Sequence, residues 1–426
     1  MEGWKELSLK DIGWFRGAGV NKLLSPEEQS VYLINYMDVY THWRIYFSTR
    51  YQLVTAKKRE IEEANLLVGD ILFTPSSEKP IDIGHAGVVM EDMPNCLYSY
   101  HLIRYRLFDR NKFDLTYLSY LLNSDEVQKH FVSRASGSGI RYTLSLNDFR
   151  SVKIRVPEKA VQIKIANILS KVDEAIESVQ NSIVAAERLK KSLMQNLLTG
   201  KMKPDGTFRT PEEFYTDEKF GQVPVGWKVK KLKDIASIQR GKFGHRPRND
   251  ERFYNGNYSF VQTNDVVESV LYLKRASQSL NELGASVSKC FPRNTIIMTI
   301  AANIGYVTLA QYEVYFPDSL IGINANENII NPMYLLFQLM GYKNVLDALA
   351  TESAQKNINY SNLRPLTILL PTNLEEQLQI TKRIIMVFNE IECKKSKILI
   401  LERLKKSLMQ NLLTGKEKII DKTWQQ

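Results

Sequence analysis

The chain has 426 residues, of which 44% are hydrophobic and 24% are charged, as in a folded globular protein and not a disordered one. No apolar run approaches the roughly 20 residues of a transmembrane helix, and the first residues lack a secretory apolar core. We therefore expect a cytoplasmic protein with no membrane partner. The net charge of +10 favours a polyanionic partner. The scattered Cys96, Cys290 and Cys393 exclude a disulfide framework and indicate no metal site.

Residues 1–157 are predicted to form a mixed, strand-rich domain. Short apolar runs of strand type, such as 31–40 and 68–74, follow turn residues. A helical segment at 116–131 precedes a polar loop at 135–145 that contains glycine and serine. The pattern predicts a compact domain that contains both strands and helices.

Residues 158–201 are predicted to form one long helix. Apolar positions alternate at spacings of four and three residues, which is the heptad seam of a coiled coil. Pro157 precedes the helix and Gly200 fits a C-terminal glycine stop. A helix of about 40 residues would be about 60 Å long. The predicted seam consists of Ile165, Leu169, Val172, Ile176, Val179, Ile183, Leu193 and Leu197.

The same order of features follows a second time. Residues 202–225 are polar and rich in proline and glycine, which predicts a linker. A second strand-rich domain is expected at 226–371, a second long helix at 372–416, and a C-terminal tail at 417–426. Thr372 with Glu375 fits a capping box, and Gly415 fits the glycine stop. The second seam consists of Ile380, Ile384, Val387, Ile391, Ile398, Leu401, Leu408 and Leu412.

An internal repeat relates the two halves. Residues 187–201 and 402–416 both read ERLKKSLMQNLLTGK, and a long fixed period indicates two copies of one unit. The globular parts match more loosely, as where Asn35 and Asp38 align with Gln262 and Asp265. Divergent domains on near-identical helices suggest two different ligands.

Chain connectivity favours an antiparallel helix pair, because a parallel pair would require a long return of the linker. The expected fold is therefore α+β, with two mixed, strand-rich domains separated by two long antiparallel coiled-coil helices and related by a pseudo-twofold axis. Two ordinary core helices in separate domains are the alternative.

The sequence contains no convincing catalytic constellation. It has no GxxxxGK[ST] loop, no HExxH, no ligand spacing among its five histidines, and no NPPY or DPPY tetrapeptide. We therefore predict a non-catalytic protein without a metal or a cofactor of its own.

Basic and polar residues in glycine-bearing loops are the candidate DNA contacts. Arginine and lysine can bind phosphates, arginine can read guanine, and amides can read adenine; a solvated surface loop is the alternative for each. The candidates in the first half are Arg16, Lys22, Arg134, Ser138 and Arg141. Those in the second half are Arg240, Lys242, Arg246, Arg248, Gln355, Lys356 and Asn357.

Over nearly its whole length the chain resembles the specificity subunit of type I restriction–modification enzymes. The resemblance rests on FGQVPVGWKVKKLKDI (220–235), FYNGNYSFVQTNDV (253–266), LPTNLEEQLQI (370–380) and the twice-used LKKSLMQNLLTGK. It implies two target recognition domains, each reading one half of a split DNA sequence, with the helices setting the unread spacer.

The resemblance also implies partners in bacterial defence. Two methyltransferase subunits would dock on the helices and hold the S-adenosylmethionine used for DNA methylation, and motor/nuclease subunits would join them for cleavage. Two other functions stay open from the residues alone: a coiled-coil protein scaffold without DNA specificity, and an unrecognised DNA-modifying enzyme.

Overall fold

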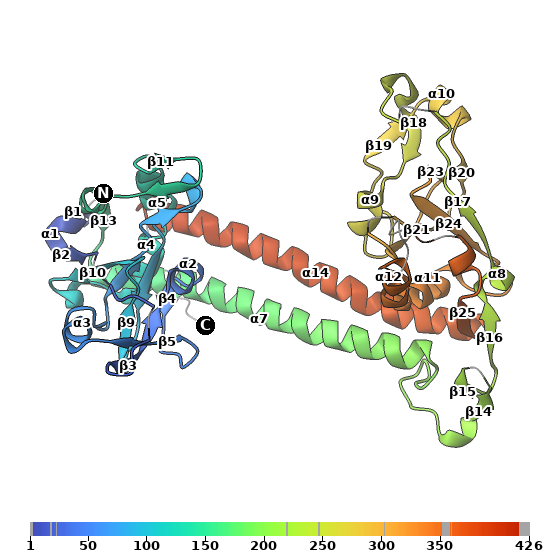
Figure 1. Cartoon of the computed structure of the whole chain (residues 1–426), viewed down its shortest axis with the longest axis horizontal. Helices are drawn as coiled ribbons and strands as arrows, with labels where there is room; N and C mark the ends of the chain where they lie inside the picture. The colour runs from blue at the N-terminus through green and yellow to red at the C-terminus, as the bar shows by residue number, and fades with distance from the viewer. Residues whose placement is uncertain are drawn as a thin grey trace, which may run out of the picture. The chain divides into compact units, whose positions relative to one another are not determined.

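The computed structural model describes residues 3–17, 19–22, 24–218, 220–245, 248–301, 303–351, 358 and 360–416. The chain divides into two compact units: unit 1 is 1–181 with 396–426, and unit 2 is 182–395. Each unit contains one globular domain and a part of each long helix (Figure 1). Among the described residues, no helix is both long and apolar enough to cross a membrane.

Unit 1 is built on a five-stranded sheet in the order β2-β10-β6-β8-β4 and a three-stranded sheet in the order β5-β3-β9. The strands of these sheets are β2 (Gly13–Arg16), β3 (Gln29–Ile34), β4 (Arg44–Ile45), β5 (Gln52–Ala56), β6 (Ile71–Phe73), β8 (Ala86–Val89), β9 (Cys96–Tyr98) and β10 (Ile103–Leu107). A further pair joins β1 (Lys5–Ser8) to β13 (Lys153–Val156), and a smaller sheet contains β7 (Ser76–Ser77), β11 (Ser136–Ser138) and β12 (Arg141–Thr143).

Short helices complete unit 1. They are α1 (Leu9–Ile12), α2 (Tyr36–Thr41), α3 (Lys58–Glu63), α4 (Leu115–Leu121), α5 (Asp125–Val132) and α6 (Leu146–Arg150), with 3-10 turns at Pro80–Asp82 and Arg110–Lys112. The larger sheet and α4, α5 and α6 enclose an apolar core in which Phe73, Phe131 and Phe149 are fully buried and pack ring against ring.

Unit 2 contains a four-stranded sheet in the order β17-β24-β21-β22 and another in the order β19-β18-β23-β20. The strands are β17 (Ala236–Arg240), β18 (Tyr254–Phe260), β19 (Gln278–Leu280), β20 (Cys290–Phe291), β21 (Ile296–Thr299), β22 (Val307–Leu309), β23 (Val314–Tyr315) and β24 (Leu320–Ala325). Two pairs join β14 (Phe214–Asp217) to β15 (Gly221–Pro224) and β16 (Trp227–Lys231) to β25 (Thr367–Pro371).

The helices of unit 2 complete its core. They are α8 (Leu232–Ile235), α9 (Thr263–Val267), α10 (Glu282–Ser286), α11 (Pro332–Gly341), α12 (Lys343–Thr351) and α13 (Tyr360–Leu363), with 3-10 turns at Pro211–Glu213 and Glu251–Phe253. Buried side chains of α11 pack with those of the β17-β24-β21-β22 sheet in one apolar core.

The sequence repeat is also a repeat of topology. The β1–β13 pair corresponds to β16–β25, and β2-β10-β6-β8 corresponds to β17-β24-β21-β22. In the second sheets, β3 pairs parallel with β9 and β18 pairs parallel with β23. Gly19 follows β2 and Gly241 follows β17, at places where a Cβ would overlap the backbone at Ser99 or Pro317. Glycine at these two places permits the close backbone approach.

The two long helices are α7 (Lys159–Leu198), with 40 residues, and α14 (Leu374–Leu412), with 39. Both are followed by a glycine with a φ of +69°, Gly200 and Gly415, which confirms the predicted glycine stops. The predicted capping box at α14 is wrong. The Asn373 side chain accepts from the Glu375 backbone N–H at 2.8 Å, whereas the Thr372 hydroxyl donates to the Gly226 carbonyl at 2.7 Å.

The segment at 202–225 is more ordered than the predicted linker. Its two strands form an antiparallel ribbon in which Val223 is fully buried. The Tyr215 hydroxyl also donates to the Trp227 carbonyl at 3.2 Å. Val223 and Met202 of this polar segment pack on the core of unit 2, and Gly206 and Gly221 adopt positive φ angles that allow the tight turns.

The three cysteines are expected to differ in reactivity. Burial raises the pKa of Cys96 to about 11, whereas Cys290 and Cys393 are exposed. Because the thiolate is the nucleophile, iodoacetamide at pH 8 should alkylate Cys290 and Cys393, and Cys96 only after denaturation. Peptide mass spectrometry of native and denatured protein measures this. Labelling of native Cys96 at the rate of the other two would contradict its burial.

Candidate nucleic-acid interface

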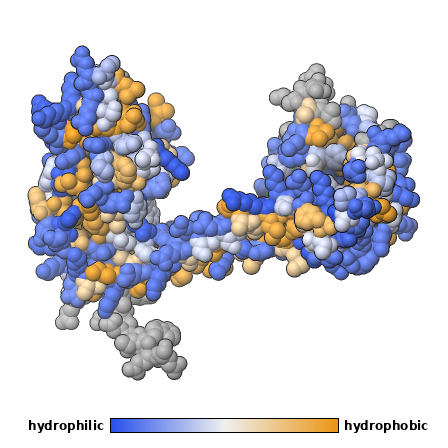
Figure 2. All heavy atoms as spheres, turned by 90° about the horizontal axis from the view of Figure 1, so that it is seen from below, coloured by the Kyte–Doolittle hydropathy of each residue, from blue (hydrophilic) through white to orange (hydrophobic). Residues whose placement is uncertain are grey.

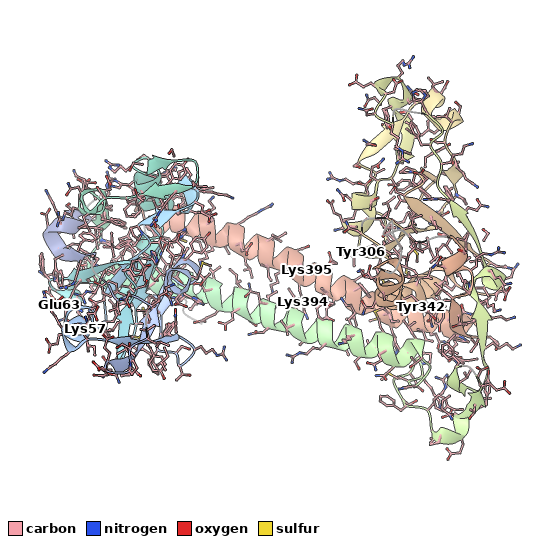
Figure 3. The ribbon with its side chains drawn as sticks, in the orientation of Figure 1. Lys57, Glu63, Tyr306, Tyr342, Lys394 and Lys395 are labelled. Carbon is pink, nitrogen blue, oxygen red and sulfur yellow. The ribbon has the colours of Figure 1, made fainter. Side chains whose placement is uncertain are left out.

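The two long helices pack against each other within both units. In unit 1, Ile165 and Leu169 near the start of α7 share a core with Leu412 at the end of α14. In unit 2, Ala186 packs with Val387 and Ile391. Each contact joins the early part of one helix to the late part of the other, so the pairing is antiparallel. All predicted seam residues are buried or half-buried. Lys394, which is labelled in Figure 3, occupies the same register, is also half-buried and forms an ion pair with Glu390.

Asp173 joins the globular domain of unit 1 to both helices. Its carboxylate on α7 accepts from Arg44 at 2.7 Å, from the Tyr120 hydroxyl at 2.5 Å and from Lys405 of α14 at 2.7 Å. Lys405 also lies 4.5 Å from the centroid of the Trp43 ring. Burial and the bond to Asp173 raise the pKa of Tyr120 to about 12, so its hydroxyl remains a donor at neutral pH.

In unit 2, the position that corresponds to Asp173 is occupied by an aromatic residue. Phe388 occupies the position of Asp173 in the repeat, and Lys190 occupies that of Lys405. The Lys190 ammonium lies 4.9 Å from the centroid of the Phe388 ring, which stacks on Phe337 at 5.8 Å. At this place in the repeat, unit 1 therefore has an ion pair between the two long helices, whereas unit 2 has a cation–π contact between them. The ion pair of Lys190 is formed with Glu187 of its own helix.

Among the candidate DNA contacts of unit 1, Lys22 and Arg141 both lie near His101. Burial is the largest cause that lowers the pKa of His101, and the positive charges of Lys22 and Arg141 lower it further. His101 and Arg141 line an open hollow of about 630 Å³, together with Tyr36, Tyr40, Lys79 and the exposed Ile140. Ser138 and Arg141 are exposed on the β11–β12 hairpin.

The other two candidates of unit 1 lie in different settings. Arg16 forms an ion pair with Glu63 of α3, at 2.5 Å, and Figure 3 labels this glutamate. Glu63 also forms an ion pair with Arg59 at 3.0 Å, so this carboxylate is shared by two arginines. Arg134 is exposed, and its guanidinium donates to the His130 carbonyl at 3.4 Å.

In unit 2, two of the candidate arginines lie beside Asp318. Arg240 donates to its carbonyl at 2.6 Å, and Arg248 forms an ion pair with its carboxylate. Arg248 also lines a hollow of about 670 Å³, together with Asn249, Asn255, Gln262, Gln278 and Ser319. Lys242 is exposed. Arg246, Gln355, Lys356 and Asn357 lie outside the described residues.

The structure places amide side chains in pairs that the sequence did not predict. Asn35 donates from Nδ2 to Gln52 Oε1 at 3.0 Å, and Gln262 donates from Nε2 to Gln278 Oε1 at 2.8 Å. The alignment of Asn35 with Gln262 was visible in the sequence. Their partners were not, because each lies on a neighbouring strand. Within the described part of the chain, no group of histidine, cysteine and acidic residues is placed to hold a metal ion.

Comparison with known proteins identifies the family. A family profile described as "Type I restriction modification DNA specificity domain" matches residues 1–188 and 224–403. The chain belongs to this family. It is similar to the putative type I restriction enzyme MjaX specificity subunit of Methanocaldococcus jannaschii, with 24% identity over 98% of this chain and 94% of the relative. The MjaVIII specificity subunit of the same organism is 26% identical over the same shares.

Solved structures share the fold. The S subunit of a type I restriction–modification system from M. genitalium is 13% identical, covers 96% of both chains and has a TM-score of 0.54. The HsdS subunit from Thermoanaerobacter tengcongensis is 17% identical, covers 98% of both chains and has a TM-score of 0.51. The α+β fold with two repeated domains and long helices is therefore that of these S subunits.

Family membership decides between the three functions considered from the sequence. This specificity subunit is a non-catalytic, sequence-specific DNA recognition subunit of a type I restriction–modification complex. Its partners are DNA and the other subunits of that complex. The scaffold and the unrecognised enzyme are not favoured.

Proposed function

We propose that each globular domain reads one half of a bipartite duplex target, and that the two long helices set the unread spacer. The supporting observation is the repeated topology, in which two similar domains differ in their surface side chains. The hollow of unit 1 has Lys79, His101 and Arg141 in its wall, and that of unit 2 has Arg248 and several amides. Different side chains on a common scaffold suit two different half-sites.

We further propose that the helices dock two methyltransferase subunits. Apolar side chains outside the seam are exposed, for example Leu399 and Ile400 in unit 1 and Met386 in unit 2, and Figure 2 shows apolar residues among hydrophilic ones on the helices. Exposed apolar groups suit protein partners. The methyltransferase subunits would hold S-adenosylmethionine, motor/nuclease subunits would join for cleavage, and the complex would act in the cytoplasm.

Selection from random duplex DNA tests the proposal. The chain is co-expressed with a methyltransferase subunit, and the DNA bound at physiological salt is sequenced. We expect a split motif with a constant gap. Exchanging residues 232–366 for those of a related chain, which leaves the β16–β25 pair intact, should change one half of the motif only.

Different outcomes of these experiments would contradict different parts of the proposal. A single unbroken motif, or a change of both halves after the exchange, would contradict independent reading of two half-sites. Affinity that does not fall with salt would contradict phosphate contacts, because binding to phosphates releases counterions. The unexchanged chain, selected in parallel, is the control for assembly of the complex.

A further inference from the structure

An amide pair occupies the same register position in both units. In unit 1, β3 and β5 are antiparallel neighbours in which Leu33 is opposite Gln52, and Asn35 lies two residues beyond Leu33. In unit 2, β18 and β19 are antiparallel neighbours in which Phe260 is opposite Gln278, and Gln262 lies two residues beyond Phe260. In both units, an amide residue just beyond the end of the first strand, Asn35 after β3 and Gln262 two residues past β18, donates its side-chain N–H to the glutamine that begins the neighbouring antiparallel strand.

The backbone fixes the first amide of each pair in the same way. Asn35 precedes α2, and its backbone N–H donates to Asp38 Oδ2 at 2.7 Å. Gln262 precedes α9, and its backbone N–H donates to Asp265 Oδ2, also at 2.7 Å. This cap uses the backbone of the amide residue and the side chain of the aspartate. Both helices have a capping box at this N-cap residue, and asparagine is favoured at N-caps, so capping explains an amide at position 35 but does not explain its glutamine partner on the neighbouring strand.

The amide pairs retain unused hydrogen-bonding atoms. Asn35 Oδ1 has no hydrogen-bond partner among the described residues but is shielded from solvent, so the accessible groups of the pair are those of Gln52. Gln52 and Gln278 are exposed, and each receives its bond on Oε1, so the Nε2 groups keep their donors. A cross-strand amide bond on the surface contributes about 1 kcal/mol or less to folding. Stability alone is therefore a weak reason for the same pair in two divergent domains.

A paired amide has the properties needed to read a base. One amide holds the other in place, so less side-chain entropy is lost on binding. An amide offers a donor and an acceptor side by side, which match N7 and N6 of adenine in the major groove. Gln262 and Gln278 line the hollow that also contains Arg248. In unit 1, Tyr36 follows Asn35 directly and lines the hollow that contains Arg141.

We propose that Asn35 with Gln52, and Gln262 with Gln278, are base-reading elements, each of which contacts the major-groove edge of an adenine in the half-site of its unit. This inference rests on the proposed reading of two half-sites. It assigns specificity to the amides, whereas the nearby arginines bind phosphate and supply affinity.

Substitutions at the glutamines test the proposal in the complex with the methyltransferase subunit. Gln52→Ala should reduce the preference at one base pair of one half-site about tenfold and leave the other half-site unchanged. Gln278→Ala should do the same at the other half-site. The salt dependence of binding should not change, because no phosphate contact is lost. Gln29→Ala, on the neighbouring strand β3 of the same sheet, and Gln222→Ala, on β15, are matched controls at exposed glutamines and should leave the motif unchanged.

A second variant keeps the pair and alters its chemistry. In Gln52→Glu, one carboxylate oxygen still accepts from Asn35 Nδ2. The other oxygen is an acceptor in the place where glutamine has its Nε2 donor. The preference at the affected position should therefore move from adenine towards cytosine, whose N4 amino group donates. This change of preference cannot arise from unfolding.

Each result has one meaning. An unchanged split motif in all of these variants would overturn the base-reading assignment while the proposed function stands. A uniform loss of affinity with a smaller salt slope would identify a phosphate contact and would also overturn it. Absence of a split motif with the unsubstituted chain would instead contradict the proposed function.

Discussion

Trp227→Ala is expected to lower the free energy of unfolding of unit 2 by about 3–5 kcal/mol, the usual cost of removing a large buried aromatic side chain. Trp227 is 2% exposed and packs edge to face on Tyr334, with ring centroids 6.5 Å apart. Its indole N–H donates to Glu376 at 3.1 Å, and the Arg209 guanidinium lies 5.4 Å from its ring. Arg209 and Glu376 also form an ion pair at 2.5 Å. The substitution therefore creates a cavity and removes the indole N–H that donates to Glu376, one member of this ion pair.

Hydrogen exchange of the full-length chain measures the loss and assigns it to a unit. Protection should fall in β16, β25 and α11, and remain unchanged in unit 1. Trp14→Ala is the matched control, because Trp14 is 38% exposed and its removal leaves a smaller cavity. Trp227→Phe should lose less stability than Trp227→Ala, since it retains most of the buried area. Equal losses for Trp227→Ala and Trp14→Ala would contradict the packing described here.

Asp173→Ala is expected to destabilise the packing of α14 in unit 1 by about 2–3 kcal/mol, in the range of lost charge-assisted hydrogen bonds. The substitution leaves Arg44 and Lys405 close together without their shared anion. The side chains of Asp173 and Arg44 are 24% and 27% exposed, so water screens part of the effect and the loss stays below that of a fully buried pair.

The measurement for Asp173→Ala is hydrogen exchange in the last turns of α14, near Lys405 and Leu412. Glu174→Ala is the matched control. It removes the same charge from the next position of α7, where the side chain is exposed, and should change exchange little. Similar hydrogen-exchange rates in the last turns of α14 in the two variants would show that Asp173 does not stabilise the packing of α14. Faster exchange confined to the Asp173 variant would support its role as the link between domain and helices.

Local sequence patterns determined the long helices and the duplication. The heptad spacing extends over about nine helical turns of each copy and the glycine stops are local signals, so α7 and α14 could be predicted to within a few residues. The identical segments at 187–201 and 402–416 showed that one unit occurs twice. These features depend on residues near one another in the chain, where spacing alone fixes the geometry.

The tertiary structure decided how individual polar side chains are used. Arg16 is a candidate DNA contact from the sequence, and the fold adds an ion pair with Glu63, 47 residues away, which no local pattern could indicate. The capping residue of α14 is Asn373 and not Thr372, because the Thr372 hydroxyl bonds to the distant Gly226. The amide pairs depend in the same way on strand register. Periodicity reports which face of an element is apolar, whereas a polar side chain takes whichever partner the fold brings within about 3 Å.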